Sequence, residues 1–225
     1  SILVLCYKNQ DLLFGMLDSI FKQDYPQIQL IVSDDGSPDF DIHTVENYIN
    51  LHKRPNIREV LVRKNETNMK TVAHLHHVMS YATGDYLVFT AADDRFYGSD
   101  AISTYVELFL NNPEKVWIVA KCTITTPDYT KTRYIAPTKK DEPYFAQGDP
   151  HLLFSRWSRR AMAIPCCMAF KKHAIDLVGG VDLDYLFMED WPLELKLVRN
   201  GYAPIFCDQI TAIHSSGGIS NENNR

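Results

Sequence analysis

The stretch LVFTAADD, residues 87–94, combines an apolar run with two consecutive carboxylates, Asp93 and Asp94. An apolar run of this length is typical of a strand that is buried on both faces of a parallel sheet. In an open α/β sheet, ligands bind just beyond the carboxyl ends of the strands. Because carboxylates are costly to bury unless they meet positive charge, the stretch predicts a central strand with a cation or ligand site at its end.

A second acidic strand end occurs earlier in the chain. The apolar residues 30–32 lead through Ser33 into Asp34 and Asp35. Four carboxylates at one edge of a sheet would supply the hard oxygen ligands that magnesium or manganese prefers, and such a metal commonly neutralises phosphate. The alternative is that Asp34 and Asp35 only form a turn before Gly36. The coincidence of two acidic strand ends favours a site.

Strands and helices alternate in the first half of the chain. Short apolar runs predict strands, and apolar residues at helical spacing predict helices between them. The expected strands cover residues 2–6, 28–33, 57–62 and 85–90, and the expected helices cover about 12–20, 41–52, 68–82 and 99–111. This alternation predicts a mostly parallel, Rossmann-like α/β sheet flanked by helices.

The pattern changes after Asn112-Pro113. Residues 124–150 are polar and lack clear periodicity, which predicts a long surface loop or a mobile flap. The remaining expected elements are strands at 116–120 and 164–170, helices near 171–178 and 191–200, and an apolar stretch at 210–213.

Composition excludes several classes of protein. The chain has 225 residues, 45% of them hydrophobic, which is enough for one large domain or two halves. A net charge of −5 with scattered Lys and Arg disfavours nucleic-acid binding. No apolar stretch reaches membrane-spanning length and no secretory leader pattern is present, so we expect a soluble, cytoplasmic chain. The five cysteines lack the spacing of a disulfide framework or a zinc site, so we expect reduced thiols.

The turn after the first strand has no glycine between Cys6 and Gln10. Dinucleotide-binding turns and P-loops both need glycines there, so a nicotinamide or flavin cofactor and a P-loop are disfavoured. Phosphate would then be handled by a metal.

A series of short motifs covers most of the chain. The motifs are the Tyr7 turn, Gln23-Asp24-Tyr25, Ser33-Asp34-Asp35-Gly36-Ser37, Asn68 opening a helix, Ala82-Thr83-Gly84-Asp85-Tyr86, Ala92-Asp93-Asp94, Gly179-Gly180-Val181-Asp182 and Glu189-Asp190-Trp191. In their order and spacing, these motifs resemble those of family 2 glycosyltransferases of the GT-A fold. The resemblance implies a single GT-A-like domain with a nucleotide-sugar-binding half at 1–115 and an acceptor-binding half at 116–225. It also implies inverting transfer from a nucleotide sugar, with UDP as the expected nucleotide.

The resemblance assigns nucleotide-binding roles in the first half of the chain. Tyr7 and Asp34 match residues that hold the nucleobase, with the Asp34 carboxylate accepting a hydrogen bond from a uracil-type ring nitrogen. Asp35 is expected beside them. Asp93 matches the last carboxylate of the Asp-x-Asp motif, which binds the metal that bridges the diphosphate. Ala91 replaces the first carboxylate of that motif.

Because of Ala91, Asp93 and Asp94 must hold Mn²⁺ or Mg²⁺ together with donor phosphate and water. His214 resembles a histidine that completes the metal shell in some relatives. Its alternative is a structural role at a strand end.

Asp190 matches the catalytic base, which removes the proton of the acceptor hydroxyl while its oxygen attacks the anomeric carbon. The alternative is a helix N-cap, because Asp190 precedes Trp191-Pro192 at the start of a predicted helix. The resemblance favours the base. Glu189 and Trp191 are expected on the acceptor side.

Two further clusters have ordinary explanations. His74 and His77 share a helix face, which is more typical of a solvated or partly buried surface than of a metal site. Arg156, Arg159 and Arg160 could contact the diphosphate or an anionic acceptor, or form a solvated helix face.

Other functions and several particulars stay open at this point. The same superfold also serves sugar-phosphate nucleotidyltransferases, although these carry a Gly- and Arg-rich first turn that this chain lacks. Ala91 leaves room for an inactive nucleotide-sugar-binding module. The acceptor could be a glycan, a lipid-linked molecule or another hydroxyl compound, as in polysaccharide biosynthesis. Peripheral membrane association through regions beyond Arg225 is also left open, as is the oligomeric state.

Overall fold

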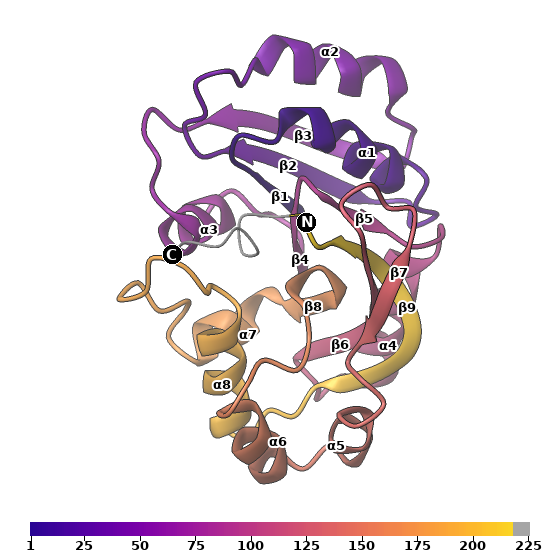
Figure 1. Ribbon diagram of the computed structural model, residues 1–225, viewed down its shortest axis with the longest axis vertical. Helices are drawn as coiled ribbons and strands as arrows, with labels where there is room; N and C mark the ends of the chain where they lie inside the picture. Colours follow the sequence, from indigo (N-terminus) through magenta and orange to yellow (C-terminus); the bar gives the residue numbers. More distant parts are fainter. Residues whose placement is uncertain (218–225) are drawn as a thin grey trace.

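The computed structural model describes residues 1–217 (Figure 1). In the first half, strands and helices alternate as predicted. The elements are β1 (Ile2–Cys6), α1 (Gln10–Phe21), β2 (Ile28–Asp34), α2 (Ile42–His52), β3 (Ile57–Lys64), α3 (Thr71–Met79), β4 (Tyr86–Ala91), β5 (Asp94–Phe96) and α4 (Ala101–Asn111).

The second half adds a mixed set of elements. They are β6 (Trp117–Thr125), β7 (Thr132–Ala136), α5 (Glu142–Gln147), α6 (Pro150–Trp157), the short 3₁₀ helix η1 (Pro165–Cys167), β8 (Met168–Lys171), α7 (Lys172–Leu177), α8 (Trp191–Arg199) and β9 (Ile205–Ser215). Within the described residues, no helix has the length and apolar character needed to cross a membrane.

One continuous sheet joins the two halves. Its strand order is β3-β2-β1-β4-β8-β6-β9-β5, and β7 pairs with β6. The strands β3, β2, β1 and β4 are all parallel, whereas β8 runs antiparallel to both of its neighbours. The predicted α/β fold, a central sheet flanked by helices, is confirmed (Figure 1).

The sheet is covered on both faces by apolar side chains. Because successive residues of a strand point to opposite faces, Val4 and Val32 pack beneath α1, α2 and α4, whereas Leu3 and Ile31 pack beneath α3, α6 and α8. These residues are all fully buried. This burial on both faces explains the continuous apolar runs of the parallel strands.

The prediction of an irregular stretch at 124–150 was wrong, because this segment contains β7 and α5. The side chains of Thr132–Ile135 are exposed, so β7 has no apolar alternation and is formed by backbone pairing with β6. The short helix α5 is anchored mainly by Phe145, which is buried. No apolar periodicity of the kind used for prediction could develop in such short elements.

The predicted helix at 68–82 was too long at both ends, since α3 spans Thr71–Met79. Lys70 has a φ of 69°, which is incompatible with a right-handed helix. The strand β9 begins at Ile205, before the apolar stretch expected at 210–213. The three-residue strand β5 was not predicted.

Candidate active site

The two acidic strand ends lie at the same edge of the sheet. In the parallel register, Cys6 pairs with Asp34 and Leu5 pairs with Ala91, so β2, β1 and β4 end side by side. Tyr7 and Asp35 directly follow β1 and β2, and Asp93 lies two residues beyond the end of β4. The predicted convergence of carboxylates at one sheet edge is therefore present in the structure.

Asp34 is fully buried and holds the turn that follows β2. Its carboxylate accepts hydrogen bonds from the backbone N–H of Ser37 at 2.7 Å and from the Ser37 hydroxyl at 2.5 Å. The Ser37 oxygen in turn accepts from the backbone N–H of Lys8 at 2.7 Å, which links this turn to the Tyr7 turn. Burial raises the pKa of Asp34, and the bonds from Ser37 oppose that rise. Its contact with a nucleobase stays a prediction.

Asp35 clamps the segment that enters α3. One carboxylate oxygen accepts from the Asn65 amide and from the backbone N–H of Met69, both at 2.8 Å, and the other accepts from the backbone N–H of Lys70 at 3.0 Å. These bonds explain why the helix starts only at Thr71. They give Asp35 a structural role, and direct contact with the nucleotide stays a prediction.

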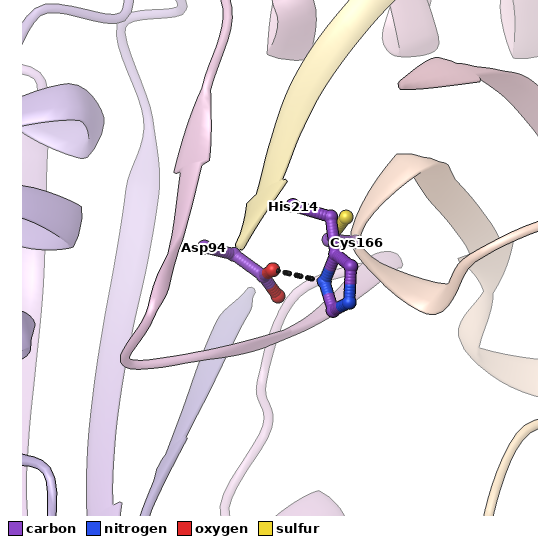
Figure 2. Close-up of side chains that lie close together, drawn as sticks. All are labelled: Asp94, Cys166 and His214. Atoms are coloured by element: carbon purple, nitrogen blue, oxygen red, sulfur yellow. Dashed lines mark hydrogen bonds and ion pairs between the residues drawn. The ribbon is translucent and has the colours of Figure 1, made fainter. Parts of the chain in front are cut away.

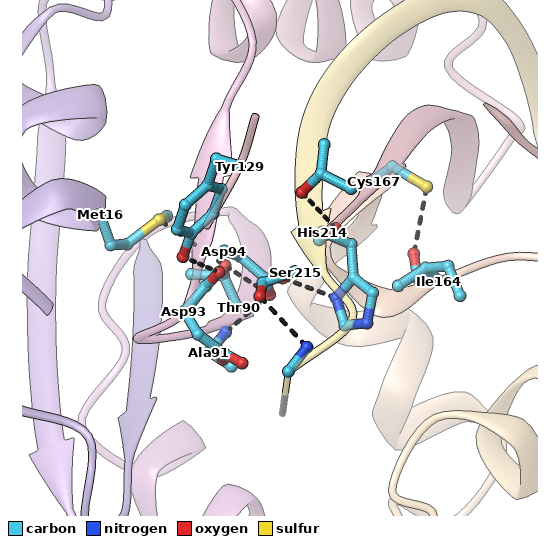
Figure 3. A network of polar contacts seen from close by, with 12 residues as sticks. Met16, Thr90, Ala91, Asp93, Asp94, Tyr129, Ile164, Cys167, His214 and Ser215 are labelled. Carbon is cyan, nitrogen blue, oxygen red and sulfur yellow. Dashed lines mark hydrogen bonds and ion pairs between the residues drawn. The ribbon is translucent and has the colours of Figure 1, made fainter. Parts of the chain in front are cut away.

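Asp94 organises the turn between β4 and β5 (Figure 3). One of its oxygens accepts from the backbone N–H of Ala91 at 3.0 Å and from the hydroxyl of Thr90 at 3.2 Å. The other oxygen lies 2.8 Å from Nδ1 of His214, which pairs with Asp94 across β5 and β9. Burial lowers the pKa of His214, but the hydrogen bond and charge of Asp94 outweigh it, so the pKa is raised.

Asp93 is buried in the same turn, yet its carboxylate has few partners. Among the described residues, no other residue donates a hydrogen bond to this carboxylate, whereas the Asp93 carbonyl accepts from the Tyr129 hydroxyl at 2.7 Å (Figure 3). Burial raises the pKa of Asp93, and the neighbouring charge of Asp94 adds to the rise. An anionic form of Asp93 would therefore gain from a cation.

Glu189 and Asp190 lie partly buried at the start of α8. The Asp190 side chain makes no capping hydrogen bond to α8, so the N-cap alternative has no support in the hydrogen bonding. Burial raises the pKa of Asp190. Burial, then the charge of Asp190, raises the pKa of Glu189 to about 7, and Asp94 also contributes to that rise.

Trp191 packs α8 against α6. Its indole N–H donates to the carbonyl of Trp157 at 2.8 Å. The role of Trp191 in acceptor binding stays a prediction.

The two clusters with ordinary explanations take part in polar networks within the protein. His74 is buried and its Nε2 lies 2.8 Å from the Ser33 hydroxyl, which also accepts from Arg63 at 2.9 Å. His77 lies 3.0 Å from the same arginine.

Two of the three arginines near Trp157 contact Asp141, which is fully buried. Arg156 lies 3.4 Å from the Asp141 carboxylate, and Arg160 lies 2.5 Å from it. Both guanidinium groups are therefore already paired with a protein carboxylate.

Sequence reasoning missed two residues close to the site. Tyr129 lies in the stretch predicted to be irregular, and it reaches Asp93 from the β6–β7 connection. Cys166 was set aside because the cysteines have no motif spacing, yet its thiol lies close to Asp94 and His214. Only the tertiary fold brings these residues together.

The donor atoms around the β4–β5 turn fit a divalent cation. Asp93 offers carboxylate oxygens that no other described residue binds, and His214 is oriented through Nδ1 by Asp94. Imidazole rings held by a carboxylate in this way are common at metal sites. Carboxylate oxygen and imidazole nitrogen together are compatible with Mn²⁺, whereas Mg²⁺ would rely more on oxygen ligands.

Proteins named as glycosyltransferases share parts of this sequence. Over 94 residues the chain is 32% identical to the putative glycosyltransferase EpsE of Bacillus subtilis, covering 42% of this chain and 32% of that protein. Over 207 residues it is 22% identical to a PGL/p-HBAD biosynthesis glycosyltransferase of Mycobacterium bovis, covering 91% of this chain and 72% of that protein. An uncharacterized glycosyltransferase of Haemophilus influenzae is 34% identical over 107 residues, 48% of this chain and 38% of that protein. The matched region thus spans only about a third of the length of EpsE and of the Haemophilus protein.

Solved structures share the fold at low sequence identity. The mannosyltransferase PcManGT of Pyrobaculum calidifontis, in complex with GDP-Man and Mn²⁺, gives a TM-score of 0.72 at 20% identity and covers 98% of this chain and 57% of its own. The 1–349 fragment of S. aureus TarS, in complex with UDP-GlcNAc, gives 0.71 at 15% identity, with coverage of 100% and 60%.

The mixed α/β sheet of this chain has the GT-A fold of these glycosyltransferase structures. The chain belongs to glycosyl transferase family 2, whose family profile matches residues 1–179.

Proposed function

We propose that the protein is an inverting glycosyltransferase that moves a sugar from a nucleotide sugar to an acceptor hydroxyl with the help of a divalent cation. One observation carries the proposal. Asp93 is buried at the sheet edge without a hydrogen-bond donor from another described residue, and burial raises the pKa of both Glu189 and Asp190. A cation and two carboxylates with raised pKa values are what assisted departure of a diphosphate and proton removal require.

The donor would bind along the ends of β1, β2 and β4. Tyr7 and Asp34 would hold the nucleobase, and the Asp34–Ser37 turn keeps the carboxylate in place. UDP is the nucleotide we favour, because an Asp34 carboxylate can accept the ring N–H of uracil. The two structural neighbours were solved with UDP-GlcNAc and with GDP-Man, so nucleotide choice is open to direct test. We place Asp35 in support of this site.

Asp93, Asp94 and His214 would hold Mn²⁺ or Mg²⁺, which when bound neutralises the charge that develops on the leaving diphosphate. Of these residues, Asp93 offers the freest carboxylate, whereas Asp94 is already engaged by the turn and by His214. Asp94 therefore orients His214 in addition to any direct contact.

Asp190 would accept the proton of the acceptor hydroxyl. Its carboxylate is not used as a helix cap, and its raised pKa makes it a stronger base than an exposed aspartate. Glu189 and Trp191 would position the acceptor. The acceptor would approach past residues 183–188, where several large apolar side chains are exposed immediately before Glu189.

The proposal allows more than one class of acceptor. A glycan, a lipid-linked molecule or another hydroxyl compound fits the chemistry, and a role in building a polysaccharide or glycoconjugate would follow. The five free cysteines of the described chain support a reducing, cytoplasmic location for the reaction.

A panel of nucleotide sugars tests the proposal. Purified protein with Mn²⁺ should hydrolyse or transfer from one nucleotide sugar, and that donor should also raise the melting temperature. Stabilisation without any turnover would indicate an inactive binding module. Release of pyrophosphate from a nucleoside triphosphate and a sugar phosphate would indicate a nucleotidyltransferase. Neither outcome is expected.

A further inference from the structure

Three side chains from distant parts of the chain meet beside the β4–β5 turn (Figure 2). Asp94 begins β5, His214 lies opposite it on β9, and Cys166 belongs to η1. One ligand atom from each side chain lies within 4.8 Å of the other two. The ligand atoms of a tetrahedral ion with ordinary bond lengths lie roughly 3.3 to 3.6 Å apart. Side-chain rotations that move the ligand atoms by about 1 Å would therefore bring them to these separations.

The three side chains are held in place by the surrounding fold. The Asp94 carboxylate is oriented by the backbone N–H of Ala91 and the Thr90 hydroxyl, which leaves its other oxygen directed at His214. The strand pairing of β5 with β9 fixes the position of that imidazole. Cys166 is buried, with a relative exposure of 2%. Ligands oriented by hydrogen bonds from outside the shell are typical of metal sites.

We propose that Asp94, Cys166 and His214 form a binding site for a thiophilic divalent cation, of which Zn²⁺ and Co²⁺ have the fitting chemistry. A set of one thiolate, one imidazole and one carboxylate favours these ions over Mg²⁺ or Mn²⁺, which prefer oxygen. Ala91 points the same way, because the position where the family motif has a carboxylate offers no oxygen ligand. The chain thus lacks one hard ligand at this turn and has a thiol within reach instead.

This site differs from the cation site of the proposed function in one ligand, because it uses Cys166 in place of Asp93. The two sites share Asp94 and His214, so the two ions compete for them. On binding, the ion takes the place of the thiol proton, which leaves to solvent, while the neutral His214 keeps its one ring proton on the nitrogen that does not bind the ion. Zn²⁺ should therefore displace Mn²⁺ from any assembly that uses His214, whether or not the protein transfers sugar.

Titration of reduced, metal-free protein with Co²⁺ tests the site without any activity measurement. Thiolate coordination gives an intense near-ultraviolet charge-transfer absorption that oxygen and nitrogen ligands do not give. We expect this absorption to saturate at one equivalent of Co²⁺ and to be displaced by Zn²⁺. It should vanish in Cys166→Ser and persist in Cys167→Ser, the matched control, because the Cys167 thiol contacts the Ile164 carbonyl and is not part of the cluster.

Two further variants sharpen the result. Asp93→Asn should keep the absorption, which separates this site from the cation site at the diphosphate. His214→Gln leaves every thiol in place and should weaken Zn²⁺ binding by at least about 100-fold, since loss of even an outer partner costs about 10- to 100-fold. Circular dichroism checks the fold of each variant. An absorption that survives in Cys166→Ser, or its absence from the wild-type protein, would overturn the proposal.

Discussion

At the scale of single residues, Asp190 carries the sharpest prediction. Asp190→Asn should leave a folded protein that binds donor and metal but turns over about 10²- to 10⁴-fold more slowly, because asparagine has no basicity. Stability should change little, since the Asp190 side chain makes no capping hydrogen bond. Steady-state rates at saturating substrates and a urea denaturation curve measure the two effects. Near-wild-type turnover of Asp190→Asn would transfer the role of base to Glu189 or Asp182.

Asp93 and Asp34 should affect donor binding in different ways. Asp93→Ala removes a carboxylate that no other described residue binds, so it should abolish the metal dependence of nucleoside diphosphate binding. Asp34→Asn keeps an oxygen that can accept from Ser37, so the turn should survive while discrimination between UDP and GDP is lost. Isothermal titration with each diphosphate, with and without Mn²⁺, separates the two. Unchanged affinity of Asp93→Ala in Mn²⁺ would remove Asp93 from the metal site.

At the scale of elements, the turn after β2 depends on a glycine. Gly36 has a φ of 78°, and a Cβ built there would lie 2.8 Å from the backbone carbon of Thr67. Gly36→Ala should therefore combine backbone strain with a backbone clash and cost more than the roughly 1–3 kcal/mol of strain alone. Gly201→Ala is the matched control, because Gly201 has a φ of 87° but no atom within 4 Å of its Cβ. Equal losses of unfolding free energy in the two variants would show that the approach to Thr67 has no cost.

The segment that connects β6 and β7 gives a second prediction at this scale. The Tyr129 hydroxyl on this connection donates a hydrogen bond to the Asp93 carbonyl. Binding of the nucleotide near Asp93 should therefore affect the β6–β7 hairpin. Hydrogen exchange of the backbone around Tyr129 should slow when UDP and Mn²⁺ are added. The helix α5, which packs on β9 through Phe145, is the internal reference and should not change. Equal protection with and without ligand would leave the connection as an ordinary surface hairpin.

The strands of the parallel half could be predicted because strands that are buried on both faces have continuous apolar sequences, as in β1, β2 and β4. β7 could not, because its side chains face solvent and backbone pairing alone defines it. The start of α3 depends on Asp35, whose bonds to Met69 and Lys70 form only in the folded chain. Among site residues, the acidic strand ends have a local signal, whereas Cys166 has none because its neighbours Asp94 and His214 are remote in sequence.

At the scale of the whole molecule, the buried His74 links global stability to pH. It joins α3 to β2 through the Ser33 hydroxyl, and Arg63 of β3 binds the same oxygen. Burial lowers the pKa of His74 to about 4, from an ordinary value of 6.5. At pH values between these two pKa values, His74 is protonated in the unfolded chain but not in the folded protein. The free energy of unfolding therefore falls as the pH falls.

For His74, this loss begins below about pH 6.5 and is complete below about pH 4. Between pH 7.5 and 5 it should amount to about 2 kcal/mol. Asp93, Asp190 and Glu194 have raised pKa values and act in the opposite sense, so the wild-type curve alone mixes several groups. His74→Gln keeps a side chain able to bond Ser33 but cannot titrate. Urea denaturation of both proteins across this pH range isolates the histidine, and parallel curves would show that His74 is protonated equally in the folded and unfolded states.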